Sequence, residues 1–272
     1  ARTRPYFLNI SFHRPHPPID PPQVYYDMYK NRNIPEIPVG EWAEKYAVPV
    51  KRTSTAYGLL PEEVLKHSRR AYYAQLAHID NQIGRLLSSF RNLNEPAPYI
   101  IFTSDHGDYM GDHSLMLKLL LHYQGLIRVP FIWSDPTADA NEQTDSGLAS
   151  SIDIPATILA RAGIQPFNGM QGRDLLSVES PEAVIVEEDS QRTMTGFDKP
   201  QRVRTVVTER YRMSLREGED WNELYDLVED PHEINNVYDD PEFASVRNEV
   251  TAIMLRKMIE LQDRAPLPAY RA

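Results

Sequence analysis

The run from Tyr99 to Ser104 (Tyr-Ile-Ile-Phe-Thr-Ser) is almost continuously apolar and is too short for a stable helix. Runs of this kind form strands that are buried on both faces of a parallel sheet. Upstream, from about residue 61 to residue 90, apolar residues recur at steps of three, four and seven, which predicts one long helix. A strand over 126–133 and a helix over 151–163 are predicted downstream. Apolar strands that lie between helices indicate a layered α/β domain.

The N-terminal segment predicts another strand, followed by a stiff loop. Residues 6–12 (Tyr-Phe-Leu-Asn-Ile-Ser-Phe) predict a short buried strand. The loop over 13–22 is dense in proline, which fixes φ and removes backbone donors, so we expect it to be extended and rigid. Residues 23–60 show no period and predict irregular structure.

The pattern changes after Pro181. Short strand candidates at 184–186, 202–208, 211–215 and 224–227 follow one another closely, as in an antiparallel sheet, and a helix is predicted from about residue 242. We therefore expect two parts. Residues 1–181 form a mostly parallel sheet flanked by helices, and residues 182–272 form a small antiparallel sheet with a terminal helix.

Composition excludes several classes of function. The 272 residues contain no cysteine, which excludes disulfides, thiolate nucleophiles and cysteine-based zinc sites. The net charge of −10 argues against nucleic acid as a partner, and no apolar run approaches the ~20 residues that span a bilayer. Nothing indicates a compartment. The chain starts at Ala1 without an initiator methionine and leads directly into a predicted strand, so we expect it to begin inside a larger domain.

A candidate metal site follows the strand that ends at Ser104. The next four residues are Asp105-His106-Gly107-Asp108, and ligands of open α/β sheets bind outside the carboxyl ends of the strands. A carboxylate and an imidazole are both competent ligands of a divalent cation. A simpler interpretation is that Asp105 caps the next segment and His106 makes an ordinary loop hydrogen bond. From these four residues alone the simpler interpretation is slightly favoured.

Two further residues are candidates for catalysis. His16 stands between prolines after a predicted strand, a position that suits a general acid or an anion contact, although a lone loop histidine is more often merely exposed. His13 competes with it. Lys118 is isolated among leucines, where it either holds a buried anion or, as is more usual, extends its ammonium to water.

Together, these segments resemble the C-terminal part of the sulfatase family, within the alkaline-phosphatase superfamily. Residues 5–18 are similar to the family's strand and Pro-His-x-Pro loop, and residues 101–113 (Ile-Phe-Thr-Ser-Asp-His-Gly-Asp-Tyr-Met-Gly-Asp-His) to its second metal-binding segment. Lys118 falls where the family has a lysine on the sulfate group. The next strand, the next helix and the C-terminal signature match in order at 128–132, 151–163 and 223–236.

The resemblance implies an alkaline-phosphatase-like fold and a metal-dependent sulfuric ester hydrolase. Asp105 and His106 would bind one divalent cation, calcium first, with manganese or magnesium as alternatives because imidazole is an unusual calcium ligand. Lys118 would contact the sulfate, and His16 would protonate the leaving oxygen. The implied substrate is a small-molecule or carbohydrate sulfate ester.

The chain departs from the family in its nucleophile. Family members make formylglycine from a Cys/Ser-x-Pro-x-Arg motif, whereas the nearest segment here, Ser134-Asp-Pro-Thr-Ala138, lacks the arginine and lies downstream of the metal segment. We therefore expect the nucleophile and the remaining metal ligands in an N-terminal portion outside this chain, and expect the chain alone to be inactive. Gln124 is a smaller departure, because many relatives have an acidic residue there.

Two alternatives remain. A phosphodiesterase or phosphonate monoester hydrolase of the same superfamily handles a tetrahedral anion with the same residues. A non-catalytic binding or assembly module derived from the fold would explain the missing nucleophile. Against that module stands the joint retention of Asp105, His106, Lys118 and His16.

Overall fold

The computed structural model describes residues 6–43, 60–93, 96–118, 120–138, 144–177, 179–191, 199–218 and 220–262. Contacts divide the chain into two compact units, each assembled from separate stretches. The first unit comprises Ala1–Ile37, Leu59–Ile101 and Trp133–Thr137, and the second comprises Pro38–Gly58, Phe102–Ile132 and Ala138–Ala272. The domain boundary expected at residue 181 stays a prediction.

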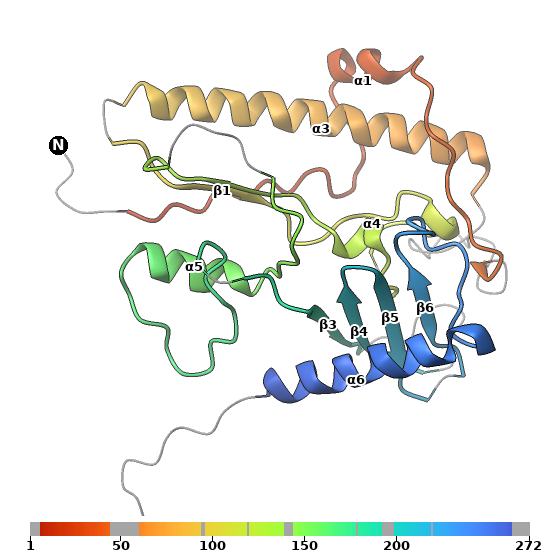
Figure 1. The fold of residues 1–272 in the computed structure, drawn as a ribbon. Coiled ribbons are helices and arrows are strands. Elements are labelled where there is room, and N and C mark those ends of the chain that lie inside the picture. Colours follow the sequence, from red (N-terminus) through yellow and green to blue (C-terminus); the bar gives the residue numbers. More distant parts are fainter. Residues whose placement is uncertain are drawn as a thin grey trace, which may run out of the picture. The chain divides into compact units, whose positions relative to one another are not determined.

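In the first unit, helix α1 (Gln23–Tyr29) lies along the long helix α3 (Glu62–Arg91), as Figure 1 shows. The prediction of α3 is confirmed. The prediction of irregular structure over 23–60 is wrong at α1, which begins directly after Pro22 and contacts α3. One such contact is a hydrogen bond of 2.9 Å between the Tyr26 hydroxyl and His67 Nδ1. Seven residues alone are too few to form a stable helix, and contact with α3 stabilises α1.

The prediction of a buried strand over residues 6–12 is wrong in two respects, because the segment is neither a strand nor buried. The segment has no strand assignment, and its side chains are exposed, with Phe7 75% and Leu8 54% accessible. A strand requires a hydrogen-bonded neighbour, and none of the described sheets includes this segment. Apolar composition alone therefore does not produce a strand here.

Strands β1 (Ile100–Thr103) and β2 (Phe131–Ser134) form a two-stranded sheet. β1 is half-buried to exposed, so the expectation of burial on both faces is wrong among the described residues. The strand predicted over 126–133 is shorter than expected, because the short helix α4 (Gln124–Ile127) occupies its first part. The helix predicted over 151–163 is confirmed as α5 (Asp153–Arg161). A mostly parallel sheet stays a prediction.

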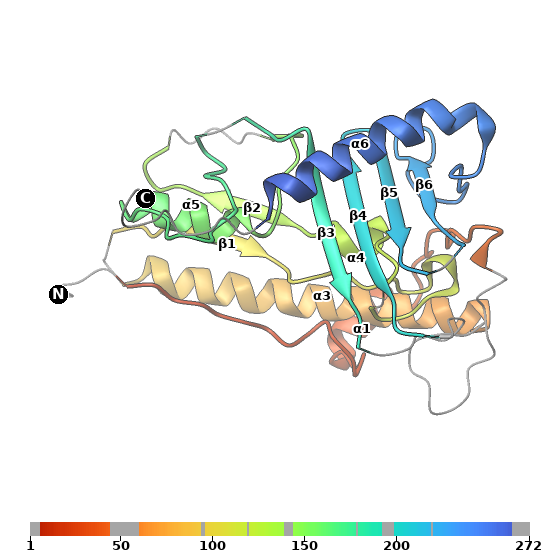
Figure 2. The same ribbon diagram turned by 90° about the horizontal axis from the view of Figure 1, so that it is seen from below.

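In the second unit, four antiparallel strands lie in the order β3 (Ala183–Asp189), β4 (Arg202–Thr208), β5 (Tyr211–Arg216) and β6 (Glu223–Asp226). The short 3₁₀ helix η2 (Pro241–Phe243) leads into helix α6 (Ala244–Glu260), which crosses one face of this sheet (Figure 2). These elements confirm the predicted sheet and terminal helix. Buried apolar residues join the sheet to α6, among them Val206, Met213, Leu224, Val250 and Met254.

The opposite face of this sheet is polar as well as apolar. Alternate residues of β5, namely Arg212, Ser214 and Arg216, are buried on that face. The segment over 109–126, which includes the 3₁₀ helix η1 (Asp112–Ser114), packs against it through Tyr109, Leu121 and Tyr123. None of the helices in the described residues combines the length and apolarity needed to cross a bilayer.

Candidate active site

A tight turn follows β1 and presents Asp105 and His106. The Ser104 hydroxyl donates to the His106 carbonyl at 2.8 Å, and the His106 backbone N–H donates to Asp105 Oδ1 at 3.0 Å. Gly107 N–H donates to the Leu126 carbonyl at 2.7 Å, which joins the turn to the end of α4. A Cβ at Gly107 would lie 2.0 Å from the Gly125 carbonyl oxygen, so only glycine permits this close approach.

The hydrogen bonds of the His106 ring define its tautomer. Nδ1 lies 2.7 Å from the Gly107 carbonyl oxygen, which can only accept, so Nδ1 carries the proton. Nε2 therefore keeps its lone pair, which accepts a hydrogen bond from the Lys118 ammonium at 2.9 Å. The Asp105 Oδ2 atom lies 3.6 Å from the same nitrogen. His106 does make the ordinary loop hydrogen bond, and that bond leaves Nε2 available as a ligand.

Asp105 is charged at neutral pH. Burial acts to raise the pKa of its carboxyl group, but the electrostatic interaction with His106, backbone N–H donors and the Lys118 ammonium outweigh burial and hold the pKa below its usual value of 3.8. The turn and Lys118 together thus place a carboxylate, an imidazole nitrogen and an ammonium group within a few ångströms of one another. That combination suits a cation and a tetrahedral anion side by side.

Asp108 fixes the backbone beside Lys118. Its Oδ1 atom accepts from the backbone N–H groups of Met110 and Leu117, both at 3.0 Å. Leu117 has a φ of 66°, a conformation that requires such external support in a residue with a bulky side chain. The sequence analysis gave Asp108 no role. Its position in the run Asp105-His106-Gly107-Asp108, next to the predicted metal ligands, could have indicated a role.

His16 belongs to the first unit, so its place beside Lys118 stays a prediction. Its side chain is exposed, as expected for a proline-flanked loop. The ring Nδ1 donates to the Pro17 carbonyl at 3.0 Å, which leaves the Nε2 lone pair free. This nitrogen can carry a proton to or from a bound substrate.

The donors present fit part of a metal site. The Asp105 oxygen and His106 Nε2, 3.6 Å apart, are close enough to share one ion. Within the described ranges no cluster of three or more His, Cys, Asp or Glu side chains gathers. A complete coordination sphere therefore needs donors beyond these two residues. One oxygen and one nitrogen suit manganese at least as well as calcium, and calcium stays an expectation.

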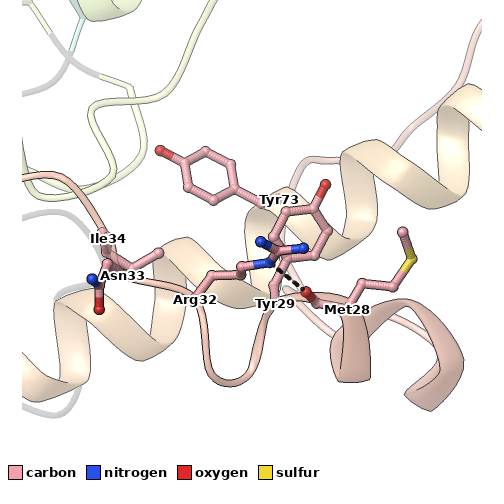
Figure 3. Close-up of a pocket in the computed structure, with 6 residues that line it drawn as sticks. All are labelled: Met28, Tyr29, Arg32, Asn33, Ile34 and Tyr73. Atoms are coloured by element: carbon pink, nitrogen blue, oxygen red, sulfur yellow. Dashed lines mark hydrogen bonds between the residues drawn. The ribbon is translucent and has the colours of Figure 1, made fainter.

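In the first unit, α1, the residues that follow it and α3 form a concave surface. A cavity of about 300 Å³ is lined by Met28, Tyr29, Arg32, Asn33, Ile34 and Tyr73 (Figure 3). None of the four predicted site residues lines it. The candidate site is therefore identified from the chemical groups of its side chains and not from this cavity.

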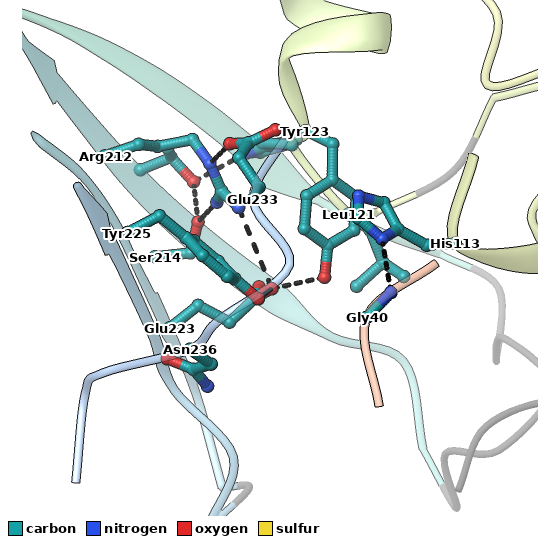
Figure 4. Close-up of polar contacts among 12 residues, drawn as sticks. Gly40, His113, Leu121, Tyr123, Arg212, Ser214, Glu223, Tyr225, Glu233 and Asn236 are labelled. Atoms are coloured by element: carbon teal, nitrogen blue, oxygen red, sulfur yellow. Dashed lines mark hydrogen bonds and ion pairs between the residues drawn. The ribbon is translucent and has the colours of Figure 1, made fainter. Parts of the chain in front are cut away.

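Behind the segment that carries Lys118 lies a buried ionic network (Figure 4). Glu223 accepts hydrogen bonds from Arg216 and Tyr123, and from the Tyr225 hydroxyl at 3.0 Å. Arg212 pairs with Glu233. All of these charged side chains are buried, so the sheet and the segment over 109–126 share one polar core.

This network also holds the backbone at Gln124. Glu233 Oε2 accepts from the Gln124 backbone N–H at 2.7 Å, and the Arg212 guanidinium lies 4.8 Å from the Tyr123 ring centre. Sequence analysis did not single out Arg212 or Arg216. The alternation of Arg212 and Ser214 in the strand predicted over 211–215, continued by Arg216 one residue beyond it, was the signal, because it places all three on one face.

The two buried glutamates have opposite pKa shifts. Burial raises the pKa of both, but the Arg216 and Arg212 charges and the Tyr123 hydroxyl outweigh burial at Glu223 and lower its pKa from 4.5 to about 2. At Glu233 burial prevails over Arg212, and the pKa is raised from 4.5. Glu223 therefore stays negatively charged at neutral pH.

His113 is expected to make the fold sensitive to acid. Its buried ring accepts from the Gly40 N–H at 3.2 Å, and burial lowers its pKa from 6.5 to about 4. A depressed histidine pKa stabilises the fold fully above pH 6.5, and this contribution is lost as the pH falls from 6.5 through 4. His113→Asn, which suits the φ of 53° and does not titrate, is expected to reduce the loss of stability across this range.

Urea unfolding at several pH values between 7.5 and 4 measures this effect. An equal loss of unfolding free energy in the parent protein and His113→Asn would show that another group causes the acid sensitivity. His78→Asn on α3 is the matched control, because that ring is half-buried and its replacement should leave the pH dependence unchanged.

Comparisons with known proteins identify the class. The sulfatase family model matches residues 1–164, and the model of the N-sulphoglucosamine sulphohydrolase C-terminal region matches residues 111–262. The solved phosphonate monoester hydrolase of Agrobacterium radiobacter superposes with a TM-score of 0.84 at 28% identity, covering 96% of this chain and 58% of that one. The structural neighbours are hydrolases of alkaline-phosphatase-like fold. The chain belongs to the sulfatase family.

Curated relatives agree. An arylsulfatase of Clostridium perfringens is 32% identical over 265 residues, which are 94% of this chain and 54% of that protein. The multifunctional alkaline phosphatase superfamily protein PehA of Trinickia caryophylli is 27% identical over 99% of this chain and 58% of its own length. The chain thus spans little more than half the length of the relatives that it matches.

Proposed function

We propose that this chain forms the C-terminal part of a metal-dependent sulfate ester hydrolase. The observation that carries the proposal is the convergence of Lys118 with the turn that holds Asp105 and His106 in a sulfatase-family chain. A carboxylate, an imidazole lone pair and an ammonium group match the charges of a cation and a sulfate. A small-molecule or carbohydrate sulfate ester is the proposed substrate class.

Each residue has a distinct proposed role. Asp105 and His106 hold a divalent cation, which when bound neutralises charge on the sulfate oxygens. Lys118 donates to a sulfate oxygen and stabilises the charge that develops in the transition state. His16, with both ring nitrogens protonated, donates the Nε2 proton to the leaving alcohol oxygen and becomes neutral, because an alkoxide is a poor leaving group.

The nucleophile is proposed to lie outside these residues. The absence of cysteine and the missing arginine after Ser134 support this assignment, as do relatives of almost twice the length. The exposed apolar side chains of residues 6–12 also fit a surface that another segment covers. Purified 1–272 is expected to show no turnover of an aryl sulfate. Metal-dependent turnover, with contaminating enzyme excluded, would instead direct attention to a hydroxyl nucleophile such as Thr103.

The metal ligands are tested by affinity. Asp105→Asn and His106→Ala are each expected to weaken cation binding in the complete enzyme by about 10-fold or more, because each removes or weakens a ligand. Calorimetric titration with Ca²⁺ and with Mn²⁺ measures the change and identifies the preferred ion. Asp145→Asn is a matched control on an exposed loop aspartate. Unchanged affinity in both site variants would place the cation elsewhere.

Phosphodiester or phosphonate monoester hydrolysis is the second candidate. It is favoured by the structural similarity to the phosphonate monoester hydrolase of Agrobacterium radiobacter. Sulfate esters and phosphodiesters both present a tetrahedral centre with anionic oxygens. Turnover of an aryl sulfate and of an aryl phosphodiester by the complete enzyme separates the two. A kcat/KM that is higher for the phosphodiester would replace the first candidate with the second.

A further inference from the structure

One buried side chain of α3, Gln75, donates a hydrogen bond to the loop that carries His16. Gln75 is fully buried, and its Nε2 atom donates to the Pro18 carbonyl at 2.9 Å. Pro18 is two residues from His16. The loop contains several prolines, which lack N–H donors, so its carbonyl groups are the natural points of attachment.

The side-chain oxygen of Gln75 makes no comparable hydrogen bond among the described residues. Its Oε1 atom is buried and has no hydrogen-bond partner within the part of the chain that the structure describes. A buried polar atom without a partner is unfavourable, and an apolar residue would fit the packing without that cost. A glutamine at this position is therefore explained by its single donated hydrogen bond to the loop.

The remaining contacts of the loop lie at its surface. Arg14 forms an ion pair of 2.7 Å with Asp20, with both side chains exposed. The His13 ring lies 4.8 Å from the His16 ring, and the His16 N–H donates to the His13 carbonyl at 3.2 Å. Exposed ion pairs contribute little rigidity. Among these contacts, the Gln75 hydrogen bond is the one whose side-chain donor is fully buried.

We propose that Gln75 is a positioning residue for His16. Its amide fixes the backbone at Pro18, and the fixed backbone orients the His16 ring with Nδ1 on the Pro17 carbonyl and Nε2 outward. This inference rests on the proton donation proposed for His16. Proton transfer depends steeply on the placement of the donor, whereas a substrate with a good leaving group does not need the proton.

The test uses Gln75→Met in the complete enzyme, because methionine has a similar volume and no N–H donor. Gln82→Met on the same helix is the matched control, since the Gln82 amide bonds only to Asn81 and Arg85 among the described residues. Both variants, and His16→Ala, are assayed with sulfate esters whose leaving groups range from nitrophenol to simple alcohols. Thermal unfolding by circular dichroism verifies that each variant is folded.

The expected result is a selective loss. Gln75→Met should keep kcat/KM for nitrophenyl sulfate within about 2-fold and lower it for alkyl esters by about 10-fold or more, part of the roughly 10²–10⁴-fold that a positioned acid supplies. Gln82→Met should resemble the parent enzyme. Adding Gln75→Met to His16→Ala should cause no further loss. An equal loss for all esters, or no loss for any, would overturn the inference.

A second measurement does not depend on catalysis. In ¹⁵N NMR spectra, the His16 ring of the parent protein should show one neutral tautomer with the proton on Nδ1, and Gln75→Met should give mixed tautomers. An unchanged His16 tautomer in Gln75→Met would overturn the inference. If His16→Ala lowers activity equally for all leaving groups while the tautomer does change, the proton-donor role fails and the positioning of the ring by Gln75 stands.

Discussion

Replacement of Lys118 by alanine is expected to lower kcat/KM for a sulfate ester by about 10²–10³-fold, the usual effect of losing one charged contact to a transition state. The Lys118 ammonium lies 2.9 Å from His106 Nε2, so it stands beside a proposed cation ligand, where it can donate to a sulfate oxygen. The effect should fall mainly on kcat, because the charge on the sulfate group is largest in the transition state.

The same variant should retain its metal. Lys118 donates a hydrogen bond and cannot act as a ligand while it is protonated, so cation affinity should change little. Steady-state kinetics together with metal analysis of the purified complete enzyme measure both quantities. Lys30→Ala is the control, because Lys30 is exposed and pairs with Asp27 on the surface. A metal content that falls in parallel with activity would reassign Lys118 to the structure of the metal site.

Replacement of Glu223 by alanine is expected to destabilise the complete protein by about 3–5 kcal/mol, as is typical when one partner of a buried ion pair is removed. The Arg212 and Arg216 side chains are both buried and would lose their shared partner. The Tyr123 hydroxyl would lose its acceptor as well. Four separate interactions therefore depend on this carboxylate, including the Tyr225 bond.

Urea unfolding measures this loss. Glu217→Ala is the matched control, because Glu217 pairs with Arg202 at 3.6 Å on the surface with more than 60% of both side chains exposed. Such pairs contribute little to stability. Glu223→Gln should lie between the two, since the amide retains hydrogen bonding without the charge. Equal unfolding free energies for Glu223→Ala and Glu217→Ala would show that the buried network contributes no more than a surface pair.

The sequence alone predicted the helices and strands that depend on residues close together in the chain. The spacing of apolar residues along α3 predicts the helix without reference to other segments, although its buried residues include Arg69, Ala74 and Gln75, which that spacing does not indicate. Strands β3 to β6 are joined in chain order, so neighbours in sequence are neighbours in the sheet. The Asp105 and His106 turn was similarly accessible, because the two residues directly follow a strand.

Features that depend on distant partners were not predictable in the same way. Helix α1 forms against α3 through pairs such as Tyr26 with His67, which are 41 residues apart. The segment over 6–12 has a strand composition but no paired strand among the described residues. The partners of Glu223 include Tyr123, 100 residues upstream, and no local pattern connects the two positions.

The buried network also limits how relatives of this chain can be recombined. A chimera joined at residue 181, where the sequence changes character, would inherit Tyr123 and Gln124 from one parent and Glu223 and Glu233 from the other. Any mismatch would leave a charge or a donor buried without its partner, beneath the segment that presents Lys118. Productive crossovers should therefore keep residues 109–126 and 202–236 from the same parent. Exchange of the terminal helix α6, which meets the sheet through apolar contacts, should be tolerated far more readily.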